Sequence, residues 1–475
     1  MQSKKDQLQA HFFVVSRTVS ALQRANADAP ETANRRSNFG LVGGILVGLL
    51  LIAGFAVFGL ISPGGQKSWR EPGTIIVEED TGARYLYLDG ELRPVQNFAS
   101  AKLLVQNGTV RTVAASSLAG VRHGPPIGIP GAPDSLPVPG NDPWMVCASS
   151  GVDSKGIARA MVVLGIGEGH VVRPIDDQHA LLVKAGDALH LVWRGRRFAF
   201  TDPAQVGSLG YAGQTPFVVD GAWLSSVPKG QDLVPPAVAD RGSPGPAVDG
   251  NATVAGQLFA GDNPGSGQRE YYVMRADGLS PLSRTDLALL RGHAETKKAY
   301  PDGKVVERQL SSAALATAPR SKTSSVTAGF PAKPPELDQA TEGGPLPCLR
   351  FEIGPAAGPE TQLVLGDRSL FDAVQADGRG VGGEADAVKV RPSSGLLARA
   401  LPAPGVTGGS LYLITDLNVK FPVPTPEVAG SLGLSADSAV AVPTLLLALI
   451  PTGPPLDPVA AQQTQPITGK PGPGR

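Results

Sequence analysis

Residues 41–61 form the only apolar run of the chain that is long enough to span a bilayer, and they contain no charged side chain. Lipid offers no hydrogen-bond partners to the backbone, so such a run crosses a membrane as a helix. About 21 residues at a rise of 1.5 Å give roughly 31 Å, the thickness of the hydrocarbon core. The pattern therefore predicts one transmembrane helix over residues 39–62, with its apolar part bounded by Leu41 and Ile61.

A cleaved signal peptide is the alternative interpretation of this run. The apolar core of a signal peptide has about 7–15 residues and follows a short basic region. Here the run is longer and about 40 residues precede it, so we expect an uncleaved anchor. Gly44 and Gly48 have the spacing at which small residues let membrane helices approach closely. Glycine is also abundant in the whole chain, with 59 of 475 residues, which offers a purely compositional explanation of the pair.

A second apolar pattern lies before the membrane run. Its positions recur at spacings of four and three residues and are Leu8, Phe12, Val15, Val19 and Leu22. This period places them on one face of a helix over about residues 4–25, with Ser3 and Asp6 as an approximate capping box. An amphipathic helix so close to a membrane either lies on its inner surface or docks on a partner. Because its polar face is mixed in charge, we favour a protein partner.

Charge and cysteine content indicate how the chain is placed in the membrane. Six basic residues precede the membrane run, and the positive-inside rule therefore puts the N-terminus in the cytoplasm and the large C-terminal part outside. The only two cysteines, Cys147 and Cys348, lie in that outer part. Two cysteines in an extracytoplasmic domain are expected to form a disulfide. Two buried free thiols are the alternative.

Beyond the membrane run, four stretches share one order of pattern. Each has an alternating apolar strand, a turn built on Asp, Gly or Asn, a second short strand, a helical turn and a further strand with a second short helix. The stretches begin at Tyr85, Leu189, Tyr271 and Leu411. A unit of about 45–50 residues buries too little surface to fold alone, so we expect the units to pack on each other or on a shared core. Their irregular spacing argues against a regular solenoid.

The segments between these units are interpreted as strands of a central module. The predicted fold class is membrane-anchored α+β, with one N-terminal transmembrane helix and four small α/β repeat domains around a central β-rich domain. The predicted repeat domains are 68–123, 170–236, 268–336 and 385–458. The predicted central domain comprises 128–168, 240–265 and 345–375. Residues 1–38 are assigned to a cytoplasmic helix and linker, and residues 459–475 to a disordered tail.

Composition and motifs point away from nucleic acid and from enzyme chemistry. Lys plus Arg and Asp plus Glu both number 42, whereas phosphate binding needs a basic surface. The pairs Gly303-Lys304 and Gly469-Lys470 lack the other residues of a P-loop. Gly165, Gly167 and Gly169 do not fit the dinucleotide spacing and are expected to form a turn. No catalytic, cofactor-binding or metal-binding residue is predicted, and Asp176-Asp177 is interpreted as a pair of loop acids.

Several blocks of residues carry a family resemblance. SWR at 68–70, IVE at 76–78, TGARYLYLDG at 81–90 and LRPVQN at 92–97 resemble the EccB family, a membrane component of the actinobacterial type VII (ESX) secretion system. The resemblance continues in blocks near residues 7–14, 128–137, 144–147 and 415–424. It extends over about residues 5–458 and is weakest around 265–345.

The resemblance implies a structural core subunit of a secretion complex, located in the inner membrane with its large domain in the periplasm. It implies copies of the chain itself, the motor ATPase EccC, and the membrane subunits EccD and EccE as partners. ATP hydrolysis has been attributed to the family, but without a P-loop we expect no nucleotide cofactor, and ATP is the one alternative. The alternative function is a membrane-tethered extracytoplasmic protein that hydrolyses nucleotides or binds the cell wall. Such a protein has no need of the N-terminal amphipathic helix.

Overall fold

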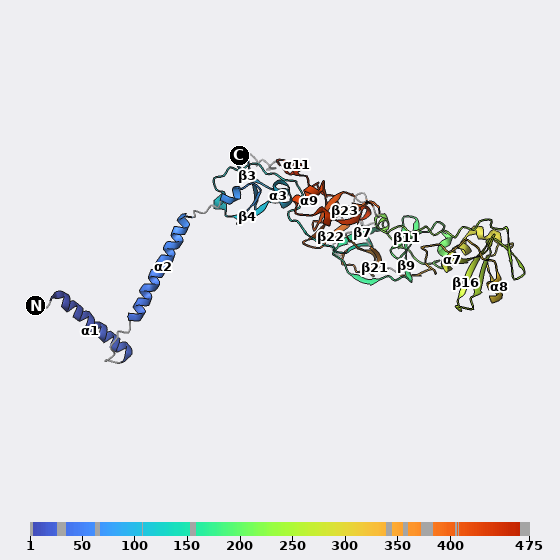
Figure 1. Cartoon of the computed structure of the whole chain (residues 1–475), viewed down its shortest axis with the longest axis horizontal. Helices are drawn as coiled ribbons and strands as arrows, with labels where there is room; N and C mark the ends of the chain where they lie inside the picture. Colours follow the sequence, from blue (N-terminus) through green and yellow to red (C-terminus); the bar gives the residue numbers. More distant parts are fainter. Residues whose placement is uncertain are drawn as a thin grey trace.

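The computed structural model describes residues 3–25, 35–61, 67–106, 108–152, 158–338, 344–354, 360–371, 383–403, 406 and 408–465. Two N-terminal helices precede an elongated body of small β-sheets connected by short helices (Figure 1). The chain is α+β, and one helix among the described residues is long and apolar enough to cross a membrane.

The two N-terminal helices follow the sequence pattern. α1 (Lys4–Arg24) begins with a capping box, in which the Ser3 hydroxyl accepts a hydrogen bond from the Lys5 amide and Asp6 accepts one from the Ser3 amide. α2 (Arg35–Ile61) contains the apolar window Phe39–Val57, whose mean hydropathy is 2.5. None of that window is buried against the rest of the chain.

The first sheet of the body shows an arrangement that recurs. Its strands are β1 (Thr74–Glu78), β2 (Arg84–Leu88), β3 (Glu91–Pro94) and β4 (Thr109–Val113). The first three form an antiparallel meander, and β4 returns parallel to β1, which gives the order β3-β2-β1-β4. The helices α3 (Phe98–Val105) and α4 (Ala115–Leu118) follow β3 and β4.

Three further sheets of the described residues have the same strand order. The second, β11-β10-β9-β12, has β9 (His179–Ala185), β10 (Ala188–Trp193), β11 (Arg196–Ala199), β12 (Phe217–Val218), α5 (Ala204–Ser208) and α6 (Gly221–Ser226). The third, β17-β16-β15-β18, has β15 (Leu258–Asp262), β16 (Arg269–Arg275), β17 (Gly278–Leu282), β18 (Glu307–Leu310), α7 (Arg284–Gly292), η2 (Ala294–Ala299) and α8 (Ser312–Thr317). The fourth, β25-β24-β23-β26, has β23 (Ser394–Leu401), β24 (Leu411–Thr415), β25 (Lys420–Val423), β26 (Val440–Pro443), α9 (Pro426–Ser431), η3 (Ala436–Ser438) and α10 (Thr444–Ala448).

In each of these sheets the predicted pattern starts one strand late, although the predicted domain bounds include β1, β9 and β23 and leave out only β15. The predicted units began with β2, β10, β16 and β24, whereas β1, β9, β15 and β23 precede them and lie between two neighbouring strands. These strands contain runs of consecutive buried residues. Because a strand covered on both faces does not alternate between apolar and polar residues, the period that marks a half-exposed strand is missing there.

A six-stranded sheet with the order β22-β7-β6-β20-β21-β8 occupies the middle of the body. Its strands are β6 (Trp144–Val152), β7 (Ala158–Ile166), β8 (Val171–Pro174), β20 (Leu346–Glu352), β21 (Glu360–Gly366) and β22 (Ala387–Val390). β8 and β22 were expected in repeat domains but join this central sheet through ladders with β21 and β7.

Residues 240–265 differ from their predicted place in the central module. Among the described strands, β13 (Pro244–Val248) and β14 (Asn251–Val254) pair with each other alone. β15 pairs with β16 and β18 in the third sheet. Two short strands complete the set: β5 (Val138–Pro139) pairs with β23, and β19 (Glu336–Leu337) pairs with β9.

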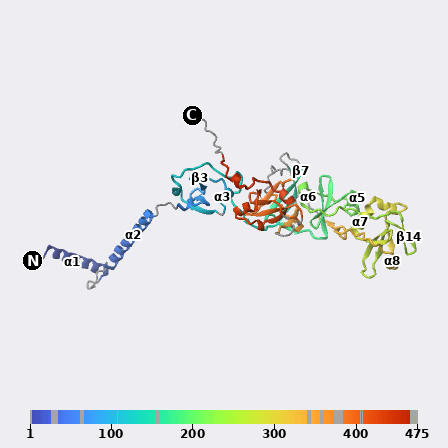
Figure 2. The same ribbon diagram turned by 45° about the horizontal axis from the view of Figure 1, so that its top comes forward.

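The four similar sheets pack in two pairs. α3 contacts α9, so the first sheet lies beside the fourth, and α5 contacts α7, so the second lies beside the third. The opposite faces of the second and fourth sheets, with α6 and α10, share one hydrophobic core with the central sheet. Starting from α2, Figures 1 and 2 show the order first, fourth, central, second and third sheet along the body.

The equivalent outer faces of the first and third sheets are covered by other parts of the chain. Trp69 of η1 (Lys67–Arg70) packs on the first sheet, and Val248 of β13 packs on the third. In the second and fourth sheets the central sheet covers this face. In the first and third sheets, at the two ends of the body, η1 and β13 cover it instead.

The predicted disordered tail is ordered over part of its length. α11 (Pro458–Ala461) contacts α3, and Ala461 is fully buried. Thr464 forms an antiparallel bridge with Ile127, and the Gln465 amide donates to the Pro126 carbonyl at 2.9 Å. The C-terminal segment therefore fastens to the first sheet up to residue 465, whereas residues 466–475 lie outside the described part of the chain.

Candidate functional site

The predicted docking face lies on α1 and is open to solvent. All five of its predicted side chains are exposed, with Phe12 at 64% and Leu22 at 78%, as are the neighbouring Phe13 and Val14. No described part of the chain covers them. An exposed apolar face of this size on a well-capped helix is a surface for a membrane or for another molecule.

The predicted membrane residues lie on α2. Leu41 is 66% exposed, and a Cβ added at Gly44 or Gly48 would meet nothing within 4 Å among the described residues. The described residues therefore leave open space beside both glycines. Ile61 ends α2, and its side chain lies outside the described part of the chain.

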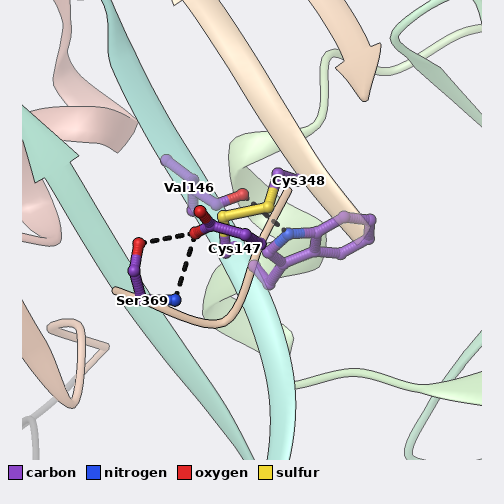
Figure 3. The surroundings of a disulfide bond; sticks show 6 residues. Val146, Cys147, Cys348 and Ser369 are labelled. Carbon is purple, nitrogen blue, oxygen red and sulfur yellow. Dashed lines mark hydrogen bonds between the residues drawn. A yellow bond between two sulfur atoms is a disulfide. The ribbon is translucent and has the colours of Figure 1, made fainter. Parts of the chain in front are cut away.

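The predicted disulfide is present and lies in the central sheet. Cys147 of β6 and Cys348 of β20 are directly opposite each other in the antiparallel ladder, and their sulfur atoms are 2.04 Å apart (Figure 3). Both cysteines are fully buried on a face shared with Met145, Val163 and Val364. The bond joins two central strands whose residues are 201 positions apart in sequence.

Gly366 of β21 leaves the room that this disulfide needs. A Cβ at Gly366 would lie 2.6 Å from the Sγ of Cys348 and 3.1 Å from the Cε of Met145. Both distances are shorter than van der Waals contact. No local pattern marks this requirement, because Gly366 comes near Cys348 only when β21 pairs with β20, where Gly366 lies opposite Leu346.

The other face of the central sheet joins the neighbouring sheets. Trp223 of α6 is fully buried, and its indole Nε1 donates a hydrogen bond to the Val146 carbonyl at 3.1 Å. Trp223, Val146 and Leu446 of α10 belong to one core. The second and fourth sheets are thus held on the central sheet by buried apolar contacts.

The two loop acids have separate partners. Asp176 accepts hydrogen bonds from the Gln178 amide at 2.8 Å and lies 2.6 Å from the Nδ1 of His179, whereas Asp177 pairs with Arg194. The hydrogen bond with His179 is the main reason why the pKa of Asp176 is lowered, and the same bond raises the pKa of His179. Because each carboxylate contacts a different side chain, the two do not form a shared acid–base pair.

The remaining motifs take structural places. Gly167 and Gly169 have φ angles of +67° and +93° in the turn between β7 and β8, and no helix follows that turn as a dinucleotide site requires. Gly303-Lys304 lies in a turn before β18, and Gly469-Lys470 lies outside the described residues. Among the residues that the structure describes, no group of three His, Cys, Asp or Glu side chains is placed to hold a metal ion.

A cavity of about 430 Å³ on the third sheet was not predicted from the sequence. Its lining comes from three separate segments, at 268–272, 281–284 and 332–333. No motif links these segments in sequence; the meander of β16 and β17 and the start of α7 bring them together.

Comparison with known proteins gives consistent similarities. The profile of the family described as "Type VII secretion system ESX-1, transport TM domain B" matches residues 1–467. The chain is 28% identical to the "ESX-3 secretion system ATPase EccB3" of Mycolicibacterium smegmatis over 480 residues, covering 94% of this chain and 87% of the relative. It is 28% identical to the "ESX-5 secretion system ATPase EccB5" of Mycobacterium marinum over 490 residues, covering 96% and 92%.

Solved structures show the same fold. A chain of the intact ESX-5 inner membrane complex superposes with a TM-score of 0.67 at 24% identity, covering all of this chain and 98% of that one. A chain of the EccB3 dimer from the ESX-3 core complex gives a TM-score of 0.64 at 25% identity, covering 82% of this chain and 99% of that one.

Proposed function

We infer that this chain, which belongs to the EccB family of type VII secretion transport components, is a structural core subunit of a type VII secretion complex. Its body forms the extracytoplasmic part of the complex and contributes to protein export across the inner membrane. The observation that carries this proposal is the pair of exposed apolar helices, α1 and α2, on a chain whose body is otherwise well packed. Two such surfaces call for a membrane and for partners on its cytoplasmic side.

The topology follows from charge and from the position of α2. The N-terminus with α1 lies in the cytoplasm, α2 crosses the inner membrane, and the body lies in the periplasm. Basic residues before α2 support this direction. The disulfide supports it as well, because disulfides persist in oxidising compartments.

The body consists of four repeat domains around a central β-rich domain. The shared strand order of four sheets supports this division, as does the pairing of equivalent helices, α3 with α9 and α5 with α7. Units of this size gain stability from neighbours. The sheets follow one another along an elongated body (Figure 1), which in this proposal extends away from the membrane.

The partners are copies of the chain itself and the membrane subunits EccC, EccD and EccE. The resemblance to a chain of an EccB3 dimer supports self-association. α1 docks on a cytoplasmic partner through Leu8, Phe12, Val15, Val19 and Leu22, and the motor subunit EccC is the partner we propose. The small surface at Gly44 and Gly48 is the proposed contact with a neighbouring membrane helix.

The subunit works without a nucleotide of its own in this proposal. Its relatives are named ATPases, but the sequence lacks a P-loop. ATP hydrolysis by the purified chain that survives removal of co-purifying EccC would refute this part of the proposal.

Deletion of residues 1–26 tests the docking role. The full complex is extracted in detergent through a tag on this chain, and the amount of co-purified EccC is measured. Deletion and Phe12→Asp are expected to abolish co-purification, whereas Gln9→Asp, an exposed polar change on the same helix, is expected to preserve it. Unchanged co-purification and unchanged secretion after the deletion would contradict the docking role. A chain that is extracted as a lone monomer would contradict the structural-subunit proposal as a whole.

A further inference from the structure

We propose that the cavity on the third sheet binds an acidic glycan. This cavity lies where β16 begins, β17 ends and α7 starts. The third sheet is at the end of the body farthest from α2 (Figure 1). The cavity is lined by Gln268, Arg269, Glu270, Tyr271, Tyr272, Pro281, Leu282, Ser283, Arg284, Ala332 and Lys333.

The charged side chains around the cavity favour an anion. Glu270, its only carboxylate, already accepts hydrogen bonds from the Tyr272 hydroxyl and from the Nδ2 of Asn263 at 2.7 Å. Arg269 is held by Gln309 at 2.5 Å and by Asp262 at 3.6 Å.

Arg284 and Lys333 are the two cations that remain available. Both are exposed, and their charged groups have no ion-pair or hydrogen-bond partner among the described residues. The backbone beneath them is fixed, because the Arg284 amide donates to the Ala332 carbonyl at 2.9 Å. Two free cations on one fixed rim can hold a carboxylate or a phosphate through charge-assisted hydrogen bonds. The N-terminus of α7 adds little to anion binding, because the carboxylate of Asp286 is already there. It accepts hydrogen bonds from the Ser283 hydroxyl and the Thr327 amide.

An apolar surface lies beside the two cations. Tyr271 is half-buried and packs on the core that contains Leu282 and Val273. Tyr271 lines the cavity together with Leu282 and Pro281. An aromatic ring next to charged groups suits a ligand with one apolar face and polar edges, and a sugar ring has both.

The backbone around the cavity disfavours an extended peptide. β16 is already paired on both sides, with β15 and with β17, and Leu279 of β17 forms a further bridge with Arg320. A peptide that binds by strand addition needs a free edge. β17 is the edge strand of this sheet, but its Leu279 amide already donates to the Pro319 carbonyl and its Leu279 carbonyl accepts from the Ser321 amide. The next outward position, Pro281, has no amide hydrogen to donate. The ligand must therefore be recognised by side chains. A cavity of about 430 Å³ has room for one or two sugar rings.

Two matched oligosaccharides test this proposal on the full chain in detergent. Hyaluronan tetrasaccharide carries carboxylates, and chitotetraose is a neutral counterpart of similar length. Isothermal titration calorimetry is expected to show saturable binding of the acidic sugar only. Arg284→Gln and Lys333→Gln are each expected to weaken that binding about tenfold. Lys304→Gln, at an exposed lysine of the same part of the chain, is expected to leave it unchanged.

Three outcomes would overturn the proposal. They are equal binding of the two sugars, an absence of saturable binding up to about 10 mM, and binding of tetraglutamate without binding of the acidic sugar. The last result would assign the two cations to an acidic peptide. Tyr271→Leu separates the contribution of the aromatic ring from that of the charges. It is expected to weaken binding of the sugar, and Arg284→Gln is expected to weaken binding further by the same factor in the Tyr271→Leu background. Thermal unfolding of every variant confirms that it is folded. None of these outcomes bears on co-purification with EccC, so the two proposals fail independently.

Discussion

The indole Nε1 of Trp223 donates a hydrogen bond to the carbonyl oxygen of Val146 across 3.1 Å. This bond links α6 of the second sheet to β6 of the central sheet, one residue before Cys147 of the disulfide (Figure 3). A directional bond inside an apolar core fixes how the second sheet is placed on the central one, because apolar contacts alone are not directional. The contact between the two sheets therefore sets their relative orientation as well as stabilising them.

Trp223→Phe tests the contribution of this bond. The change removes the N–H donor and keeps most of the apolar volume, so we expect a loss of about 1–2 kcal/mol in the free energy of unfolding. Urea unfolding of the purified chain measures it. Trp69→Phe is the matched control, because Trp69 is also buried but its Nε1 has no hydrogen-bond partner among the described residues. An equal loss in both variants would show that the bond contributes nothing beyond packing.

Reduction of the disulfide is expected to destabilise the central sheet. Cys147 and Cys348 are 201 residues apart, and a bond across a loop of that length contributes about 5 kcal/mol in the chain-entropy model. Thermal unfolding with and without dithiothreitol measures the effect. The double variant with Cys147→Ala and Cys348→Ala should have a low melting temperature that reductant does not change. A wild-type melting temperature that is unaffected by complete reduction would contradict the prediction.

Gly366→Ala is expected to destabilise the chain by about 1–3 kcal/mol, since its Cβ would overlap the Sγ of Cys348. Gly354→Ala is the control, because a Cβ there meets nothing within 4 Å. The cost at Gly366 should shrink when Cys348 is also replaced by Ala, because the overlapping sulfur is then gone. A double-mutant cycle on unfolding free energies measures this coupling. Full additivity of the two changes would contradict the steric explanation.

Local patterns predicted the parts of the molecule that depend on local physics. The apolar run gave α2, the period of Phe12 and its neighbours gave α1, and Asp89-Gly90 marked the turn between β2 and β3, where Asp89 has a φ of +52°. The disulfide followed from having only two cysteines in one compartment. These features need no knowledge of how distant segments pair.

The features that could not be predicted from the sequence depend on pairing between distant segments. β22 carries the short run Ala387–Val390 and joins the central sheet only because β7 lies beside it in parallel register. Ala461 and Gln465 belong to a segment rich in Pro, Gln and Thr, and their order comes from contacts with the first sheet, more than 300 residues earlier. Arg284 and Lys333 face one cavity only after β17 and α7 have folded. No local period encodes such contacts.

His179 supplies a prediction about pH. Its Nδ1 lies 2.6 Å from Asp176 and its Nε2 lies 3.9 Å from Glu336 of β19, and the bond with Asp176 is the main reason why its pKa is raised. A raised pKa in the folded state means that the stabilisation is fully present below the unfolded value of about 6.5 and is lost as pH rises through the folded value. Titration of the His179 ring by NMR in the intact chain should therefore give a midpoint above about 6.5.

Two neighbouring carboxylates separate the causes of that shift. Asp176→Asn removes the hydrogen-bonded charge and should return the midpoint of His179 toward the ordinary histidine value. Asp177→Asn is the matched control, because Asp177 pairs with Arg194 and should leave the midpoint almost unchanged. Since His179 and Glu336 join β9 to β19, protonation should also slow hydrogen exchange of the Glu336 amide, which donates to the Gln178 carbonyl at 2.8 Å. A midpoint that stays raised in Asp176→Asn would assign the shift to Glu336 and Asp338 instead.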